Sequence, residues 1–305
     1  MSFFSIVIPS YNRASLIIET IDSVRAQTFQ SWECIIVDDG STDSTRDLIE
    51  DINKEDARVR YIYQDNSERS AARNNGVKHA MGEWICFLDS DDAFDSSYLE
   101  KLKSFIEGQT LEKYLIITNF STWDGVSTTQ VETPDLSEPI SDWLFQHPVS
   151  PSRVCAHRSI FQDFKFREDI CIVEDTVLWV SIATKFPITQ LKDHLILYRE
   201  HAFNSVIANS GSCFKRCEGM KLFFQHPLSN SVSSSMKKKM LSETEFRIAE
   251  YYQFHHNKLK AAQYALKSLF TQWNHEQRKM RILFLLESIP VFNVIRKKQK
   301  NENQR

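Results

Sequence analysis

The fold is decided by residues 5–43, SIVIPSYNRASLIIETIDSVRAQTFQSWECIIVDDGSTD. Two continuously apolar runs, Ser5–Ile8 and Cys34–Val37, flank the segment Ala14–Gln27, whose apolar residues recur at helical spacing. Apolar runs without alternation are typical of strands that are covered on both faces, as in parallel sheets. The stretch therefore predicts a strand–helix–strand unit with two parallel strands.

The same alternation continues through the first 120 residues. Further strands are predicted at Arg60–Tyr63, Trp84–Leu88 and Leu115–Thr118, and further helices at Ser44–Asn53, Ser70–Met81 and Ser96–Gly108. This order predicts an α/β fold in which a doubly wound, mostly parallel sheet is flanked by helices.

The rest of the chain changes character twice. Residues 121–150 are polar and proline-containing, so we expect a loop-rich insertion there, before a helix near Asp175–Lys185 and a strand at Leu195–Arg199. Beyond Ser210 the pattern becomes wholly helical and ends in a basic tail. We therefore predict two parts, residues 1–210 and an all-helical C-terminal extension over residues 211–305.

Composition excludes several classes of protein. The chain has 305 residues, of which 42% are apolar and 25% are charged, as in globular proteins. Its 7 glycines form neither a dinucleotide fingerprint nor a P-loop. It has neither an apolar run long enough to span a membrane nor a signal peptide. Cys34 and Cys86 lie within strand-like runs, which indicates reduced thiols and a cytoplasmic protein.

The net charge of −3 conceals a gradient along the chain. Residues 1–110 carry 11 basic and 20 acidic residues, residues 111–210 carry 8 and 13, and residues 211–305 carry 18 and 7. The basic end is compatible with an ordinary solvated helical surface or with a surface that faces an anionic membrane or polymer. The acidic N-terminal half disfavours nucleic acid as a partner.

Polar residues follow three of the predicted strands, at the edge where parallel sheets bind ligands. They are Pro9-Ser10-Tyr11-Asn12-Arg13, Asp38-Asp39-Gly40 and Asp89-Ser90-Asp91-Asp92. Each group alone is also compatible with a turn, a helix cap or a solvated loop. Together they bring several carboxylates to one edge, which predicts a bound Mg²⁺ or Mn²⁺ and a diphosphate ligand that completes its coordination.

The same residues carry a family resemblance. SIVIPSYNR, IIVDDGSTDST and SAARNNGVKHAMGEWICFLDSDD resemble, in order and spacing, the pattern of glycosyltransferase family 2 on a GT-A fold. The resemblance is strong over residues 3–100, weaker over 150–206 and absent from the C-terminal helices. It implies that residues 1–110 bind a nucleotide sugar and that residues 111–210 form the acceptor side.

The resemblance also implies individual roles in the donor site. Asp39 would accept a hydrogen bond from a uracil ring, and Asp91 of the D-x-D motif would bind the metal. The remaining residues of the implied donor site are Pro9, Tyr11, Arg69, Arg73, Asp89 and Ser90.

Two further segments resemble the family's catalytic half. CIVEDTVLWVSIA resembles the Glu-Asp motif, which makes Asp175 the catalytic base and Glu174 its neighbour in the acceptor site. LYREHAFNSV is a looser match, which would place His201 near the metal. The acceptor would lie over Pro151–Ala156, with Trp143 and Trp179 as candidates for stacking on a sugar or, alternatively, for core packing.

The implied function is that of an inverting transferase that moves a sugar from a nucleoside-diphosphate sugar to an acceptor hydroxyl. Asp39 alone favours UDP, and surface polysaccharide or glycolipid assembly is the implied context. The alternatives are a catalytically inactive GT-A-like binding protein and a sugar-nucleotide nucleotidyltransferase, although the latter usually carries a glycine-rich loop.

The expected partners are the nucleotide-sugar donor and a saccharide or lipid-linked acceptor. The basic C-terminal region could contact the inner face of a membrane, since Ile282–Ile295 is apolar and precedes Arg296-Lys297-Lys298. A homodimer is a second role for the same helices.

Overall fold

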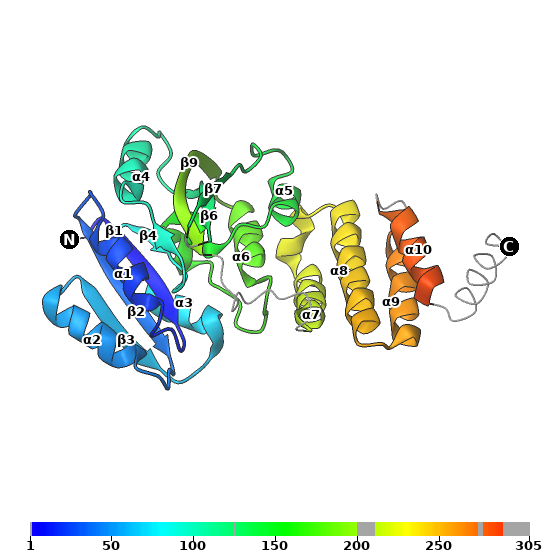
Figure 1. Cartoon of the computed structure of the whole chain (residues 1–305). Coiled ribbons are helices and arrows are strands. Elements are labelled where there is room, and N and C mark those ends of the chain that lie inside the picture. The colour runs from blue at the N-terminus through cyan, green and yellow to red at the C-terminus, as the bar shows by residue number, and fades with distance from the viewer. Residues whose placement is uncertain (1, 125, 200–210, 274–276, 289–305) are drawn as a thin grey trace. The chain divides into compact units, whose positions relative to one another are not determined.

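The computed structural model describes residues 2–124, 126–199, 211–273 and 277–288 of the chain (Figure 1). It divides the chain into two compact units. The first comprises Met1–Glu168 and Glu174–Phe203, and the second comprises Asp169–Val173 and Asn204–Arg305.

The first unit is built on one mixed sheet with the strand order β3-β2-β1-β4-β8-β6-β9-β5, and β7 pairs with β6. The strands are β1 (Phe4–Ser10), β2 (Trp32–Asp39), β3 (Val59–Gln64), β4 (Trp84–Phe87), β5 (Ala93–Phe94), β6 (Leu115–Trp123), β7 (Thr128–Val131), β8 (Val154–His157) and β9 (Ile188–Arg199). The neighbours β3, β2, β1 and β4 are mutually parallel, so their carboxyl ends share one edge.

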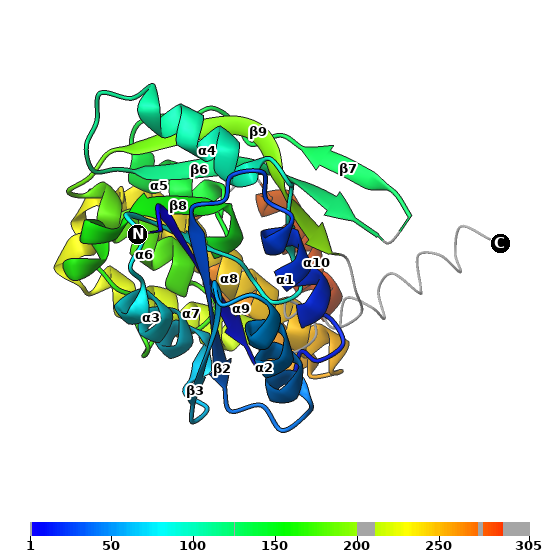
Figure 2. The same cartoon turned by 90° about the vertical axis from the view of Figure 1, so that its left-hand side faces the viewer.

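Helices cover both faces of this parallel part (Figure 2). The helices of the unit are α1 (Ile17–Arg25), α2 (Thr45–Glu55), α3 (Glu68–His79), α4 (Tyr98–Glu107), α5 (Ile140–Gln146) and α6 (Glu174–Ala183). Ile6 and Ile36 face a buried cluster with residues of α1, α2 and α4. Val7 and Val37 face α3 on the other side of the sheet. Their side chains are the atoms nearest to Gly76, which is a residue of α3. The layering follows from side chains that alternate between the two faces of each strand.

The α/β class, the six predicted strands and the helices between them are confirmed, but the sheet is less parallel than expected. Strand β8 pairs antiparallel with both β4 and β6. Residues 121–150 are also not simply loop, because they contain the end of β6, all of β7 and α5. The sequence of β7, TTQV, is mostly exposed, so it shows no apolar run that would predict a strand.

The second unit is helical, as predicted for the C-terminal region. It contains α7 (Ser212–Phe224), α8 (Ser234–Phe254), α9 (Lys258–Thr271) and α10 (Arg278–Ser288). Cys213 and Cys217 pack against Ile248 and neighbouring aromatic rings, and within the described ranges no cluster of three His, Cys, Asp or Glu side chains could hold a metal. None of the described helices combines the length and apolarity needed to cross a membrane.

Gly76 sets how closely α3 approaches the sheet. A Cβ atom at this position would lie 2.3 Å from Val7 Cγ1 and 3.3 Å from Val37 Cγ2, well inside van der Waals contact. The helix therefore needs a residue without a side chain where it crosses β1 and β2, and this fixes the helix that also carries Arg73.

We expect Gly76→Ala to lower the free energy of unfolding of the first unit by about 1–3 kcal/mol, because overpacking outweighs the helical preference of alanine. Urea denaturation followed by circular dichroism measures the change. Gly108→Ala is the matched control, since its Cβ would find no atom closer than 3.5 Å. Equal effects of the two substitutions would show that the close approach of α3 is not what matters.

Candidate active site

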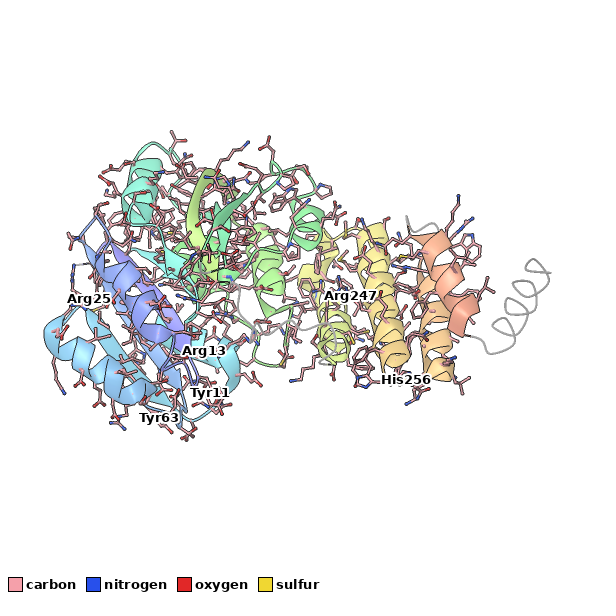
Figure 3. All side chains as sticks on the ribbon, viewed as in Figure 1. Tyr11, Arg13, Arg25, Tyr63, Arg247 and His256 are labelled. Atoms are coloured by element: carbon pink, nitrogen blue, oxygen red, sulfur yellow. The ribbon has the colours of Figure 1, made fainter. Side chains whose placement is uncertain are left out.

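Two turns at the carboxyl edge of the sheet are tied together by hydrogen bonds. The backbone N–H of Asn12 donates to Ser41 Oγ at 2.9 Å, and that of Thr42 donates to Asn12 Oδ1 at 2.8 Å. Asn12 has a positive φ of 52°, which asparagine tolerates better than most residues. The turn places Tyr11 and Arg13 just beyond the end of β1 (Figure 3). Tyr11 is 48% exposed there.

Asp38 and Asp39 end β2 and are held differently. Asp38 accepts hydrogen bonds from the Ser41 backbone N–H at 2.9 Å and the Tyr61 hydroxyl at 2.7 Å, one on each oxygen. Asp39 accepts two on Oδ1, from Gln64 Nε2 at 2.7 Å and from the Ser67 backbone N–H at 2.9 Å. Both oxygens of Asp38 therefore accept hydrogen bonds within the fold, whereas the two hydrogen bonds to Asp39 are on one oxygen, Oδ1.

Arg73 joins the D-x-D segment to the Glu-Asp segment. Its guanidinium, 3% exposed, lies 2.7 Å from Asp89 Oδ1 and 3.5 Å from Glu174 Oε1. The ring of Phe166 lies beneath it, with its centroid 5.3 Å away. Burial lowers the pKa of Arg73, but the charges of Asp89 and Glu174 together raise it more, so the guanidinium stays charged.

Arg69 reaches the same carboxylate from the solvent side. Its Nε lies 3.8 Å from Glu174 Oε1, and its side chain is 46% exposed. Both arginines come from α3, so the helix directs two cations at the start of α6. The structure thus brings together four residues that the sequence predicted for the site: Arg69, Arg73, Asp89 and Glu174.

The three aspartates after β4 have different surroundings. Asp91 is 21% exposed at the side chain and lies 3.7 Å from Arg13. Asp92 is buried and accepts a hydrogen bond from Ser152 Oγ at 3.0 Å. Burial, and then the charges of Asp89 and Asp91, raise the pKa of Asp92 well above its ordinary value. Asp89 and Asp91 both keep part of their side chains exposed, 30% and 21% respectively, and Asp89 is already in close contact with Arg73, while Asp92 is part of the framework.

Ser152 supports this segment from a distant part of the chain. Its Oγ accepts a hydrogen bond from the Asp89 backbone N–H at 3.0 Å and donates to Asp92. It lies in the short 3₁₀ helix Pro151–Arg153. Sequence reasoning placed Pro151–Ala156 at the acceptor but gave no role to Ser152 or to Arg13. Arg13 could have been found, because it ends the quoted motif SIVIPSYNR, whereas no local pattern marks Ser152.

Asp175 is the second residue of α6 and is half-buried. Burial, and then the charge of Glu174, raise the pKa of Asp175 to about 7. Its Oδ1 accepts the backbone N–H of Thr176 at 2.5 Å. A carboxyl with this pKa can take up and release a proton near neutral pH, which an ordinary aspartate cannot do.

Two remaining predictions concern aromatic residues and His201. Trp143 and Trp179 are core residues, because both are buried and their indole N–H groups donate to the backbone oxygens of Asp135 and Val149. The alternative of core packing was therefore correct for both. His201 lies outside the described residues.

Comparison with known proteins identifies the first unit. The family model described as glycosyl transferase family 2 matches residues 5–134. A glycosyltransferase of Rickettsia felis, described as uncharacterized, is 38% identical over 186 residues, which are 59% of this chain and 30% of the relative. Residues 5–134 of the chain belong to glycosyltransferase family 2. It spans less than a third of the length of that relative.

Further relatives and solved structures also match this chain. The putative teichuronic acid biosynthesis glycosyltransferase TuaG of Bacillus subtilis is 43% identical over 103 residues, covering 33% of this chain and 41% of TuaG. A crystal structure of S. aureus TarS 1–349 in complex with UDP superposes with a TM-score of 0.64 at 20% identity, covering 95% of this chain and 81% of that one. The mannosyltransferase PcManGT of Pyrobaculum calidifontis, in complex with GDP-Man and Mn²⁺, has a TM-score of 0.54 at 16% identity, with 98% and 84% covered. These two structures show the shared GT-A fold.

We expect Arg73→Met to lower the free energy of unfolding by about 3–5 kcal/mol, because it leaves the buried Glu174 without its buried cation and also removes the close partner of the partly exposed Asp89. Urea denaturation measures this loss, and the double variant Arg73→Met/Glu174→Met should recover part of it. Arg69→Met is the control, since an exposed pair contributes less than about 1 kcal/mol. A loss at Arg73 no larger than at Arg69 would contradict the assignment of Arg73 as the buried link.

Proposed function

We propose that this protein transfers a sugar from a nucleoside-diphosphate sugar, with UDP as the nucleotide, to an acceptor hydroxyl with inversion at the anomeric carbon. The observation that carries the proposal is the connection made by Arg73 between Asp89 and Glu174. Arg73 contacts both the D-x-D segment and Glu174, and Glu174 directly precedes Asp175. A base for the acceptor and a site for the leaving group would therefore lie together.

Asp175 is the proposed catalytic base. An acceptor hydroxyl that attacks the anomeric carbon must lose its proton, and a carboxylate with a pKa of about 7 takes it efficiently. Glu174 would orient the acceptor, since its Oε2 is buried without a hydrogen-bond partner in the described part of the chain. A hydroxyl group of an acceptor sugar would satisfy such an atom.

Mn²⁺ or Mg²⁺ is the proposed cofactor, and Asp91 would be its ligand, with His201 as a second one. The described residues hold no cluster of three ligating side chains, which fits a cation that takes its remaining ligands from a diphosphate and water. Such a cation would offset the negative charge that develops on the leaving diphosphate.

Asp39, Tyr11 and Pro9 are the proposed contacts of the uracil base. The hydrogen bonds of Asp39 gather on Oδ1, which suits an aspartate whose other oxygen receives a ring N–H. The UDP complex of TarS supports this nucleotide, although the GDP-Man complex of PcManGT shows that the fold accepts another. Asp89 and Ser90 would lie toward the ribose.

The acceptor is proposed to be a growing saccharide or a lipid-linked sugar, as the name of TuaG suggests for a relative. The inactive GT-A-like binding protein and the nucleotidyltransferase are the competing functions, and a test of turnover separates them from the transferase. A cytoplasmic location, membrane contact of the C-terminal region and a homodimer stay predictions.

We expect Asp175→Asn to lower kcat by about 10²–10⁴-fold, because the amide cannot accept the proton, while nucleotide binding is retained. The wild-type rate should fall about tenfold for each pH unit below about 7, where the Asp175 carboxyl becomes protonated. Single-turnover transfer from UDP-sugars measures both. Asp193→Asn, an exposed aspartate of the same unit, is the control. A near-normal rate for Asp175→Asn would remove Asp175 as the base.

We expect UDP with Mn²⁺ to raise the melting temperature by roughly 5 °C at 100 times its dissociation constant, which corresponds to about 2.7 kcal/mol. GDP and dTDP should shift it less, and Asp91→Ala should abolish the metal-dependent part. Asp51→Ala, an exposed aspartate on α2, is the matched control. No shift with any nucleotide would contradict the proposed donor site and favour an inactive relative.

A further inference from the structure

Large exposed apolar side chains concentrate in the helical unit. Eight of the thirteen among the described residues lie between residues 211 and 288, although that unit is much the shorter one. The six on and after α9 are Leu259, Leu266, Phe270, Trp273, Met280 and Leu283, which we call the apolar face. Isolated exposed apolar residues are common, but a group of this size on adjacent helices indicates a binding surface.

The α9 helix has apolar residues on two different sides. Ala261, Ala265 and Leu269 are buried within the unit. Leu259, Leu266 and Phe270 are spaced seven and four residues apart, which places them on one other side of the helix. Their side chains are 72%, 44% and 78% exposed. The second side is therefore not needed for the packing of this unit.

Positive charges border the apolar face. The α9 helix carries Lys258 and Lys260 beside Leu259 and no acidic residue, and α10 begins with Arg278 and Lys279. Lys267 of α9 is instead paired with Glu245 at 3.1 Å. The Arg278 guanidinium lies 5.0 Å from the centre of the exposed Trp273 ring. Lysine and arginine beside apolar residues can keep their charges at the headgroups while their aliphatic stems follow the apolar side chains inward.

We propose that the apolar face lies on the surface of an anionic membrane, with Leu259, Phe270 and Trp273 inserted among the lipid headgroups. Charge decides between this occupant and a second copy of the chain, because residues 211–305 carry 18 basic and 7 acidic residues and two such regions repel each other. The described helices cannot cross a membrane, so the helices rest on it.

The apolar face overlaps only in part with the segment expected from the sequence, since Leu283 is the residue that the two share. Sequence reasoning pointed to Ile282–Ile295, part of which lies outside the described residues. The apolar face lies mainly on α9. The small residues Ala261 and Ala265 of this helix are buried within the unit, whereas its large apolar residues in the face are exposed. The inference does not depend on transferase activity.

Vesicle flotation of the full chain tests the proposal. We expect binding to vesicles of phosphatidylcholine with phosphatidylglycerol, weaker binding at high salt and little binding to phosphatidylcholine alone. Phe270→Ser/Trp273→Ser should reduce the bound fraction about tenfold, and Lys258→Gln/Lys260→Gln should do so to a similar extent. Leu111→Ser, at a 40% exposed leucine of the other unit, is the control and should bind normally.

Three results would overturn the proposal. The first is failure of the wild-type chain to bind anionic vesicles, and the second is binding that Phe270→Ser/Trp273→Ser leaves unchanged. The third is a wild-type dimer in light scattering that this double variant converts to a monomer, which would make a second copy the occupant. Unchanged helical circular dichroism of the variants shows that a loss of binding does not come from unfolding.

Discussion

The buried guanidinium of Arg73 is the interaction on which the site depends. It holds Asp89 and Glu174, which lie 16 residues after it and 101 residues after it in the chain. An unpaired charge in the interior is costly, so the buried Glu174 needs a cation beside it, whereas the side chain of Asp89 is 30% exposed. Gly76, one turn further along α3, allows the helix to approach the sheet closely enough to deliver that cation. The geometry of the donor edge and the start of α6 are thereby coupled through one side chain.

The carboxylates at the edge of the sheet are compensated unequally. Asp89 has the close contact with Arg73, and Asp92 is buried beside the Ser152 hydroxyl, where a raised pKa favours its neutral form. Asp91 lies 3.7 Å from Arg13 and keeps part of its surface in solvent. Asp92 thus belongs to the framework of the loop, Asp89 is held by the buried Arg73, and Asp91, the proposed metal ligand, has an arginine that is itself partly exposed as its neighbour.

Much of this arrangement could be predicted from the sequence, because it rests on local patterns. Apolar runs predict β1, β2 and β4, and polar residues that follow them mark the ligand-binding edge. The contact between Arg73 and Glu174 could not be predicted, since it joins residues 101 apart whose meeting depends on how α6 packs. Strand β7 was missed because its side chains are exposed, and the position of β8 between β4 and β6 follows from tertiary packing alone.

Arg73 acts differently on the adjacent carboxylates of Glu174 and Asp175. Glu174 receives both arginine contacts, whereas Asp175 forms no ion pair within the part of the chain that the structure describes and is influenced by Arg73 only at a distance. The charge that is retained on Glu174 then raises the pKa of Asp175 in addition to burial. A direct contact between Arg73 and Asp175 would instead lower that pKa and weaken the carboxylate as a base. Arg73 therefore contacts the start of α6 through Glu174 and leaves Asp175, the proposed base, without a direct ion pair to it.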